Sequence, residues 1–504
     1  MERDLIIGID SGTQSVRVIV FDMLGRIVSY GAAKHAPCIT LQNGGVEQDP
    51  ADIWQCFCKA CRQAMSNLQG SISRIAACSI TSQRSTMIAV DENGTPLRPA
   101  FSWMDQRKNE EVSSQLPDYL QEIQKRAKAH WMRLNEPHLY RSVFRFLPVS
   151  GWLTQRLCGQ FHDCEGSVAG IWPFDIEKLA WSDNPQLYEA YAFPPEKLPL
   201  VFPPGALLGR VTRAAEEETG LPEGLPLRAG SGDKMCEMLG AGAIRADQGY
   251  ITYGSMAGLE VNIRRPIFAP TGEYWTNPAA MPGWWNLEFA VQRGYLMLSW
   301  FSRQFNPATE TNGCNGEQLL DQEAAVVPAG SDGIVVAPYW MPTEIARGAR
   351  SVILGLDDHH SRAHLYRAVL EGTAFALRQG MNRMIQDTRQ PLAEVIAGGG
   401  GARSDLVMQI TADIIGLTVW RVQTVDTCSL GTAIIAAVGE GLYETFEEAV
   451  DKMVLRRECF VPHPGQQAIY TEIFQNVYER IYPSMKNVFE SFNVVFENIR
   501  KEAQ

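Results

Sequence analysis

The chain has 504 residues, of which 45% are hydrophobic and 20% are charged, and its formal net charge at pH 7 is −12. This length exceeds what one hydrophobic core usually serves, so two domains are expected. The acidic balance argues against general nucleic-acid binding, which depends on Lys and Arg contacts to phosphates. No apolar run approaches the length of a membrane span, and the N-terminus reads directly into a strand rather than a signal peptide. We therefore expect a cytoplasmic protein with neither a membrane nor a nucleic acid as partner.

The opening segment reads as two strands joined by a tight turn. An apolar run, Leu5–Ile9, ends at Asp10; the turn Ser11–Gly12–Thr13 follows, and Val16–Phe21 forms the second strand. A turn of this kind presents backbone N–H groups and a hydroxyl to a phosphate, while the acid can hold a metal ion. A third strand at 26–31 is expected to complete a meander.

Residues 50–68 show apolar positions at helical spacing, with Asp49 as the expected N-cap and Pro50 in the first turn. This helix carries Cys56, Cys58 and Cys61. A zinc site would need a fourth ligand and less awkward spacing, so we interpret the three cysteines as parts of a structural helix.

The opening pattern returns in the second half of the chain. The segments between are, in order, strands at 75–80 and 86–90, a polar and largely helical stretch at 106–134, a helix near 152–157 and Pro-rich connections at 194–205 and 221–226. Strands at 248–254 and 258–263 then flank the turn Gly254–Ser255, as the first two strands flank theirs. This repeat predicts a weak internal duplication, with two similar domains facing one cleft and a boundary near 240–248.

A glycine run, Gly398–Gly401, lies between an expected strand at 393–397 and an expected helix at 405–415. Such a run lets a nucleotide approach the backbone closely. It is not the dinucleotide fingerprint, because Arg403 stands where the third glycine is needed, and no P-loop motif is present. Ser404 and Asp405 are interpreted as a helix N-cap.

Asp357, Asp358, His359 and His360 precede a long expected helix at 361–384. They resemble metal ligands, but we interpret them as a capping turn, because carboxylates are favourable at a helix N-terminus. A helix at 430–441 and a closing helix from about 466, with a Tyr/Ile/Phe stripe read as a packing face, complete the chain.

Several of these motifs together resemble the FGGY family of carbohydrate kinases, within the actin/hexokinase/Hsp70 ATPase-domain superfamily. The matching segments, in chain order, are GIDSGTQSVR (8–17), VEQDPADIW (46–54), WMDQR (103–107), SVILGLDDHHSRAHLYRAVLE (351–371), GGGGARSDLVMQITADIIG (398–416) and SLGTAIIAAVGEGLY (429–443). The resemblance implies an α/β fold with two actin-like (ribonuclease H-like) domains around a central cleft, each a mixed five-stranded sheet flanked by helices. It implies a sugar-binding and catalytic domain at 1–245, a nucleotide-binding domain at 246–445 and a helical extension at 446–504 packed on them.

The resemblance also implies ATP and Mg²⁺ as cofactors. Asp233 would be the general base, and Asp10 would act through Mg²⁺, with both acids reaching the ion through water. Residues implied to bind ATP and its phosphates are Gly12, Thr13, Gln14, Arg17, Gly254, Ser255, Gly399, Gly400 and Gly401. Lys234 follows Asp233 directly, and we expect it to point away, because adjacent residues on an extended segment face opposite sides.

Residues implied to bind substrate are Gln83, Arg84, Trp103, Asp105, Arg107 and Asp233. Gln83–Arg84 is similar to the Gln-Arg pair of glycerol kinases, although Ser85 stands where those carry a glutamate. The xylulokinase-like Gln-Met-His-Gly is absent, no counterpart of a family Lys-x-x-Trp segment is apparent between Arg107 and Trp152, and the stretch after Pro338 lacks the family's Gly-Glu-Arg element.

The overall layout is nearest to xylulokinase-like members, which implies transfer of the γ-phosphoryl group to a small sugar, with a ketopentose such as xylulose favoured. Other polyols and sugar acids remain alternatives. So do a degenerate kinase that serves as a sensor and an ATP-switched binding protein of the same fold. The expected partner is a small sugar, with a homodimer left open.

Overall fold

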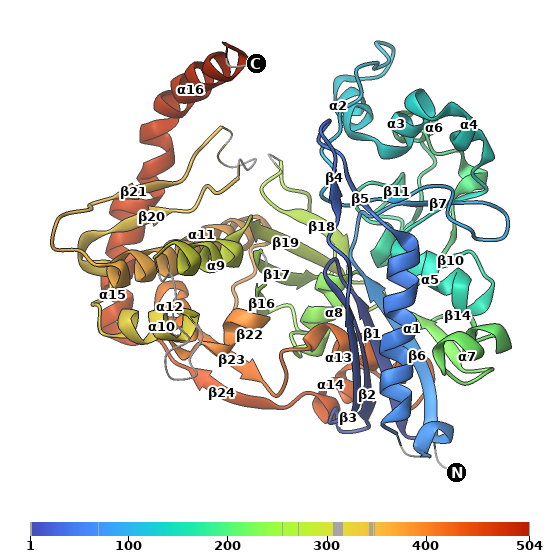
Figure 1. Ribbon diagram of the computed structural model, residues 1–504. Helices are drawn as coiled ribbons and strands as arrows, with labels where there is room; N and C mark the ends of the chain where they lie inside the picture. The colour runs from blue at the N-terminus through green and yellow to red at the C-terminus, as the bar shows by residue number, and fades with distance from the viewer. Residues whose placement is uncertain are drawn as a thin grey trace. The chain divides into compact units, whose positions relative to one another are not determined.

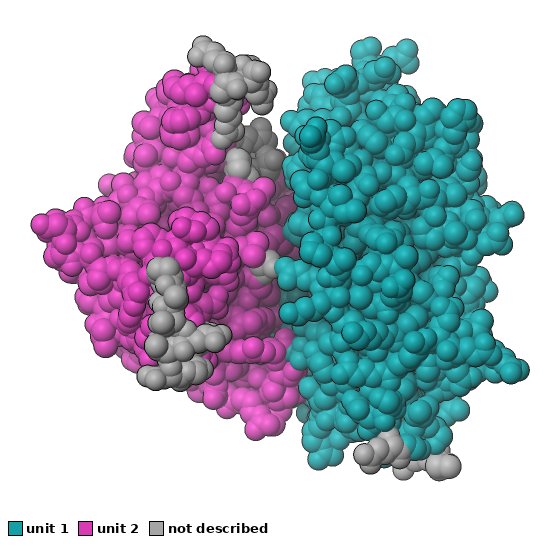
Figure 2. Space-filling view, viewed as in Figure 1, with its two compact units in different colours: residues 1–242, 277–285, 426–454 teal, residues 243–276, 286–425, 455–504 magenta. Residues whose placement is uncertain are grey.

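The computed structural model describes residues 3–68, 70–254, 256–270, 272–305, 316–341, 346 and 348–502 (Figure 1). It divides into two compact units, coloured separately in Figure 2. Unit 1 comprises residues 1–242, 277–285 and 426–454, and unit 2 comprises residues 243–276, 286–425 and 455–504. Both units are therefore assembled from separated stretches of chain.

Unit 1 is built on a six-stranded mixed sheet in the order β14-β15-β6-β1-β2-β3. These strands are β1 Leu5–Ser11, β2 Ser15–Asp22, β3 Ile27–Lys34, β6 Ile75–Ser82, β14 Leu207–Arg210 and β15 Pro226–Ala229. Strand β1 runs antiparallel to β2 and parallel to β6, and β2 runs antiparallel to β3. The expected opening meander is therefore confirmed.

Helices α1 Pro50–Ser66, α5 Val149–Cys158, α8 Asp233–Gly240 and α13 Thr427–Gly439 contact the strands of this sheet. The other helices of unit 1 are α2 Asp118–Arg126, α3 Lys128–Asn135, α4 Pro137–Ser142, α6 Pro185–Tyr191, α7 Arg213–Thr219 and α14 Phe446–Met453. Side chains alternate along β1: Ile7 and Ile9 join one buried cluster with Phe57 of α1. Gly8, between them, lies directly against the backbone of α13.

The remaining strands of unit 1 form small sheets. One has three strands: β4 Ile39–Thr40, β5 Val46–Gln48 and β8 Ala100–Phe101. The others have two strands each: β7 Ile88–Val90 with β9 Arg145–Leu147, β10 His162–Cys164 with β13 Leu200–Phe202, and β11 Phe174–Asp175 with β12 Ala180–Trp181.

Helix α1 shows why the sequence pattern there predicts a helix. Asp49 caps it by accepting a hydrogen bond from the Ala51 N–H at 2.9 Å, and Pro50 occupies its first turn. Cys58 and Cys61 are buried in the core beside Phe57. The expected helix is confirmed, and Cys56 is partly buried and packs against the same cluster.

Unit 2 repeats the same plan on a seven-stranded sheet in the order β18-β19-β17-β16-β22-β23-β24. Its strands are β16 Gln248–Tyr253, β17 Ala257–Ile263, β18 Trp275–Pro278, β19 Trp285–Val291, β22 Glu394–Gly398, β23 Thr418–Val422 and β24 Arg456–Phe460. The hairpin β16–β17 is antiparallel and β16 is parallel to β22, as β1 is to β2 and β6. The repeated motif in the sequence therefore corresponds to a repeated sheet topology.

The helices of unit 2 are α9 Gly294–Phe305, α10 Gly316–Ala325, α11 Arg362–Thr388, α12 Asp405–Ile415, α15 Pro464–Ile473 and α16 Glu479–Glu502, and a small hairpin joins β20 Val335–Ala337 to β21 Val352–Leu354. Helix α12 begins after Ser404, whose side chain accepts from the Val407 N–H, so the N-cap expectation is confirmed. The turn at 357–360 precedes α11 as expected, and Ser361 is the N-cap of that helix.

The mixed α/β fold with two units is the fold class expected, but the sheets are wider than five strands. In unit 1 the extra strand β14 pairs with β15. In unit 2 the edge strands β18 and β24 extend the sheet. The expected helical stretch at 106–134 is only partly helical, because α2 begins at Asp118. Among the described residues, none of the helices is long and apolar enough to cross a bilayer.

Candidate active site

The turn after β1 places Asp10 at the tip of a fully buried strand. The Gly12 N–H donates to the Ser15 carbonyl at 3.0 Å and closes the turn, as the sequence predicts. Asp10 is only 5% exposed, and its Oδ2 lies 2.9 Å from Arg17 Nη2. Burial raises the pKa of Asp10 to about 6, against the opposing charge of Arg17. A further cation close to this buried carboxylate would stabilise its charged form.

Arg17 bridges two segments that are far apart in sequence. Its second guanidinium nitrogen, Nη1, donates to Asp426 Oδ1 at 2.9 Å, at the start of α13. Arg17 thus lies beside Asp10 and is held there by two carboxylates, Asp10 and Asp426. Gln14, at the exposed tip of the same turn, accepts a backbone hydrogen bond from His35.

Thr13 is the centre of a hydrogen-bonded chain that joins the turn after β1 to Gln83 and Trp103, two residues expected to bind sugar. Its hydroxyl donates to Gln83 Oε1 at 2.8 Å and accepts from the Trp103 indole N–H at 2.8 Å. Gln83 in turn donates to Gln48 Oε1 at 2.7 Å. Gln83 is buried, whereas the Trp103 side chain is 40% exposed, so the indole has one face available to a ligand.

Asp233 is the first residue of α8. Its Oδ1 accepts from Arg84 Nε at 2.8 Å and from the Lys234 backbone N–H at 2.9 Å. The premise that Asp233 and Lys234 lie on an extended segment is wrong, because both belong to the first turn of a helix. Asp233 and Arg84, both candidates from the sequence, are thereby brought together.

Glu237 is a neighbour that the sequence analysis did not single out. It lies one turn after Asp233 on α8, and its Oε1 accepts from Lys234 Nζ at 2.8 Å. The charges of Asp233 and Glu237 both raise the pKa of Asp10, and the charge of Lys234 lowers it. The i, i+4 spacing of Asp233 and Glu237, which places two acids on one helix face, was the signal available in the sequence.

Asp105 and Arg107 pair with each other. Arg107 Nη2 and Asp105 Oδ2 are 2.6 Å apart, the two side chains are 4% and 2% exposed, and Asp105 also accepts from the Val46 N–H. Arg107 further contacts Glu47 at 3.0 Å and lies over the Trp131 ring at 4.3 Å. The pair therefore holds the segment that carries Trp103 against Val46 and Glu47.

The structure identifies a Lys-x-x-Trp element, Lys128 to Trp131, that the sequence analysis missed. Lys128 Nζ donates to the carbonyls of Ser85 and Ser102, at 2.5 and 2.7 Å. Burial lowers its pKa to about 7. The motif is present in the sequence as KAHW (128–131). The statement that no counterpart lies between Arg107 and Trp152 is therefore wrong.

Unit 2 carries the second set of candidates. Gly254 ends the β16 strand and donates to the Met256 carbonyl at 3.0 Å, while Ser255 lies outside the described residues. Gly399 has a φ of +79°, which disfavours any side chain, and Gly401 packs against the Tyr295 ring. Among the residues that the structure describes, a side chain at Gly400 would meet none within 4 Å. The backbone at Gly400 is therefore open to a ligand, as a nucleotide-binding glycine run requires.

Comparison with models of protein families shows which family the chain belongs to. Residues 5–240 match the N-terminal domain of the FGGY family of carbohydrate kinases, and residues 249–440 match the C-terminal domain of that family. The chain belongs to the FGGY family of carbohydrate kinases. This FGGY kinase is thus a phosphotransferase that uses an alcohol group as acceptor, in a family that uses ATP.

Relatives of the FGGY kinase span nearly its full length. It is 29% identical over 484 residues to a protein of Escherichia coli strain K12 described as "Uncharacterized sugar kinase YgcE", covering 95% of this chain and 93% of the relative. It is 28% identical over 491 residues to the autoinducer-2 kinase of Yersinia pseudotuberculosis serotype O:3, covering 93% and 92%.

Solved structures share the fold of this FGGY kinase. The xylulose kinase of Lactobacillus acidophilus superposes with a TM-score of 0.84 at 22% identity, over 97% of this chain and 99% of that one. The ADP-bound glycerol kinase of Plasmodium falciparum gives 0.81 at 20% identity, over 95% and 98%. The relatives are named for different substrates. Membership of the FGGY family therefore establishes that the chain is a sugar kinase but not which sugar it phosphorylates.

The donor set in unit 1 fits Mg²⁺, the ion typical of such kinases. Asp10, Asp233 and Glu237 are carboxylates whose charges interact, and oxygen ligands are what Mg²⁺ prefers. Asp10 is also buried, and a nearby cation favours the charged form of a buried carboxylate.

Proposed function

We propose that this FGGY kinase transfers the γ-phosphoryl group of ATP to a hydroxyl of a ketopentose such as xylulose, in the cytoplasm. The observation that carries the catalytic part is the hydrogen bond of 2.8 Å between Arg84 and Asp233, because it joins the expected base to the expected sugar-binding arginine. The substrate class is supported by the layout shared with xylulose kinases.

Asp233 accepts the proton of the attacking hydroxyl. Its Oδ1 already accepts from Arg84 and from the Lys234 backbone, so Oδ2 is the oxygen that takes the proton. Phosphoryl transfer has a loose transition state, so most of the catalysis is positioning and charge stabilisation, and proton acceptance contributes about 10²–10⁴-fold. Trp103 offers its indole face to the apolar side of the sugar, while Gln83 and Arg84 supply polar contacts.

Asp10, Asp233 and Glu237 would hold Mg²⁺, in part through water. A bound Mg²⁺ supplies neutralisation of the charge on the phosphate oxygens. In unit 1, Thr13, Gln14 and Arg17 are the residues that would bind phosphate. In unit 2, considered by itself, the turn at Gly254 and the open backbone at Gly400 would bind a nucleotide.

The test is an ADP-release assay with Mg²⁺-ATP across ketoses, aldoses, polyols and sugar acids, run beside Asp233→Asn. We expect xylulose to raise turnover well above the rate without sugar and the variant to lose that increment. Turnover that no compound alters would favour an ATP-switched binding protein. Thermal stabilisation by one sugar without turnover would identify a sensor.

A second candidate substrate is autoinducer-2. It is favoured by the 28% identity to autoinducer-2 kinase over 93% of this chain, which exceeds the 22% identity to the Lactobacillus acidophilus xylulose kinase. The same assay separates the two, because the substrate with the larger kcat/KM is the one for which the site is built.

A further inference from the structure

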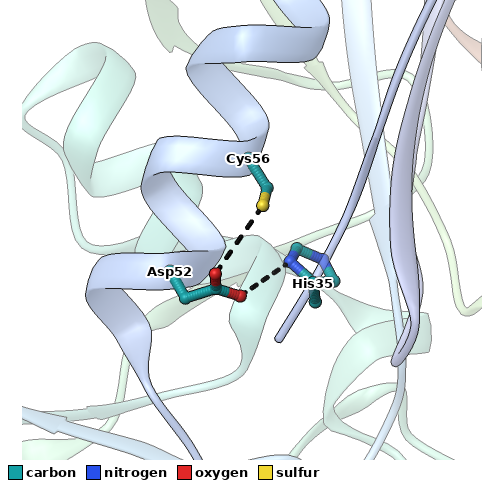
Figure 3. Close-up of side chains that lie close together, drawn as sticks. All are labelled: His35, Asp52 and Cys56. Atoms are coloured by element: carbon teal, nitrogen blue, oxygen red, sulfur yellow. Dashed lines mark hydrogen bonds and ion pairs between the residues drawn. The ribbon is translucent and has the colours of Figure 1, made fainter. Parts of the chain in front are cut away.

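A histidine, an aspartate and a cysteine gather where β3 ends beside the first turns of α1 (Figure 3). His35 follows β3 directly, while Asp52 and Cys56 lie four residues apart on α1, on one face of the helix. One donor atom from each lies within 4.8 Å of the other two. This group is separate from the acids Asp10 and Asp233.

The spacing of the donor atoms is close to that of a bound metal. His35 Nδ1 lies 3.4 Å from Asp52 Oδ2, and Cys56 Sγ lies 3.9 Å from Asp52 Oδ1. In a tetrahedral zinc site, with ligands about 2.0–2.3 Å from the metal, neighbouring donor atoms are about 3.3–3.8 Å apart. The two contacts use different oxygens of Asp52, and one donor atom from each residue lies within 4.8 Å of the others, so the Cys56 and Asp52 side chains must rotate to close a site.

His35 provides a second and independent indication of a ligand. Its side chain is 0% exposed and its Nδ1 lies 3.4 Å from Asp52 Oδ2, yet among the described residues neither ring nitrogen has a hydrogen-bond partner of good geometry. A buried polar group without such a partner is costly, and native structures usually satisfy it. Burial also lowers the pKa of His35, against the opposing effect of Asp52, so the imidazole is in the neutral form that binds metals.

We propose that His35, Asp52 and Cys56 form a binding site for Zn²⁺, with a water molecule as the fourth ligand. An imidazole nitrogen, a carboxylate oxygen and a thiolate are the donors that zinc takes in proteins. Burial raises the pKa of the Cys56 thiol, and the charge of Asp52 raises it further, so zinc binding displaces one proton from Cys56 to solvent.

The site is connected to the phosphate turn through the backbone. The His35 N–H donates to the Gln14 carbonyl at 2.9 Å, and Cys56 Sγ contacts the Lys34 carbonyl at 3.2 Å. The Ala36 N–H donates to Asp52 Oδ2 at 3.0 Å. Zinc would thus tie α1 to the chain segment that supports Gln14.

The test uses the full chain, freed of metal with a chelator and titrated with Co²⁺ and then with Zn²⁺. One equivalent of Co²⁺ should give the sulfur-to-cobalt charge-transfer absorption of a thiolate ligand, and Zn²⁺ should remove it. Cys56→Ser should abolish this absorption, and His35→Gln should weaken Co²⁺ and Zn²⁺ binding at least tenfold. Circular dichroism checks that both variants are folded.

Two controls make the result specific. Cys459→Ser alters an exposed thiol and should leave the absorption unchanged. His359→Ala alters the exposed group Asp332, His359 and His360, which contains no thiol, and should also leave it unchanged. The proposal is overturned if the absorption persists in Cys56→Ser, or if the unaltered protein binds Co²⁺ without it or does not bind Co²⁺.

Discussion

The Nε of Arg84 donates a hydrogen bond of 2.8 Å to Oδ1 of Asp233, a residue 149 positions further along the chain. The first of these residues follows β6 and the second begins α8. The bond fixes the carboxylate in one rotamer, so that the other oxygen is presented in a constant direction. Positioning of this kind is the main contribution that a protein can make to a loose phosphoryl transfer.

Replacing Arg84 with Met should therefore lower kcat/KM for the sugar by about 10- to 100-fold, because a charged hydrogen bond contributes about 1.5–3 kcal/mol. Steady-state kinetics with varied sugar checks this. Arg74→Met is the matched control, since Arg74 pairs with Asp4 on the surface. Equal kcat/KM in the two variants would show that the Arg84–Asp233 bond has no role in turnover.

Thr13 should be sensitive to loss of its hydroxyl rather than of its methyl group. Thr13→Val removes the donor to Gln83 and the acceptor for Trp103, so kcat should fall about 10-fold or more, since the buried Gln83 left without this donor costs about 1–3 kcal/mol. Thr13→Ser keeps the hydroxyl and should retain most activity. Similar kcat values for the Val and Ser variants would contradict the role given to the hydroxyl.

Asp10 should make the protein less stable as pH rises. Its pKa in the folded chain is about 6, above the ordinary value of 3.8, so the folded state holds the proton more tightly than the unfolded state does. The free energy of unfolding should fall between about pH 4 and pH 6, by about 3 kcal/mol in total.

Asp10→Asn cannot titrate, so its stability relative to the natural protein should improve by about this amount between pH 4 and pH 8. Urea unfolding at both pH values, with a chelator present, measures the difference. A constant difference across this range would show that Asp10 titrates normally. The same variant should be inactive as a kinase, because Asp10 is an expected ligand of Mg²⁺.

Lys128 should influence sugar binding through the two segments that it joins. Lys128→Met removes hydrogen bonds to the Ser85 and Ser102 carbonyls, which adjoin Arg84 and Trp103. The KM for sugar should rise about tenfold, since about 1.4 kcal/mol of positioning is a factor of ten, while the KM for ATP stays unchanged. Lys125→Met is the control, because Lys125 pairs with Glu122 nearer the surface. A rise in both KM values would indicate general loss of structure instead.

The crossing of α8 and α13 should not tolerate a side chain. A Cβ added at Gly431 would lie 1.9 Å from the Cys236 carbonyl oxygen, which belongs to the backbone of α8 and cannot move alone. Gly431→Ala should lower the free energy of unfolding by about 1–3 kcal/mol or more. Gly465→Ala, where nothing lies within 4 Å, should leave it nearly unchanged in the same denaturation experiment.

Local patterns in the sequence predicted those parts of the fold that local physics determines. The apolar strand that ends at Asp10, the cap at Asp49 and the cap at Ser404 each depend on residues within a few positions of one another. The repeat of the hairpin at 248–263 correctly indicated a second sheet of the same plan.

Relationships between distant residues were not predictable in this way. Arg17 and Asp426 are 409 positions apart, and nothing in either segment indicates their ion pair. Whether Asp105 and Arg107 face a ligand or each other depends on the burial supplied by Trp131 and Glu47. Asp233 was identified by its position in a family motif, but the i, i+4 spacing of Glu237 becomes informative only once the structure shows that both residues lie on a helix.

Residues 426–454 belong to unit 1 although they are synthesised after most of unit 2, and this affects folding during synthesis. Gly8 of β1 lies against the Ser429 carbonyl of α13, so the first strand stays uncovered on one face until that helix is synthesised. At a synthesis rate of about 5–20 residues per second, more than 400 residues separate the two events by about 20–80 seconds. A nascent chain that stops near residue 242 would expose the apolar underside of its central sheet and would need a chaperone to remain unaggregated.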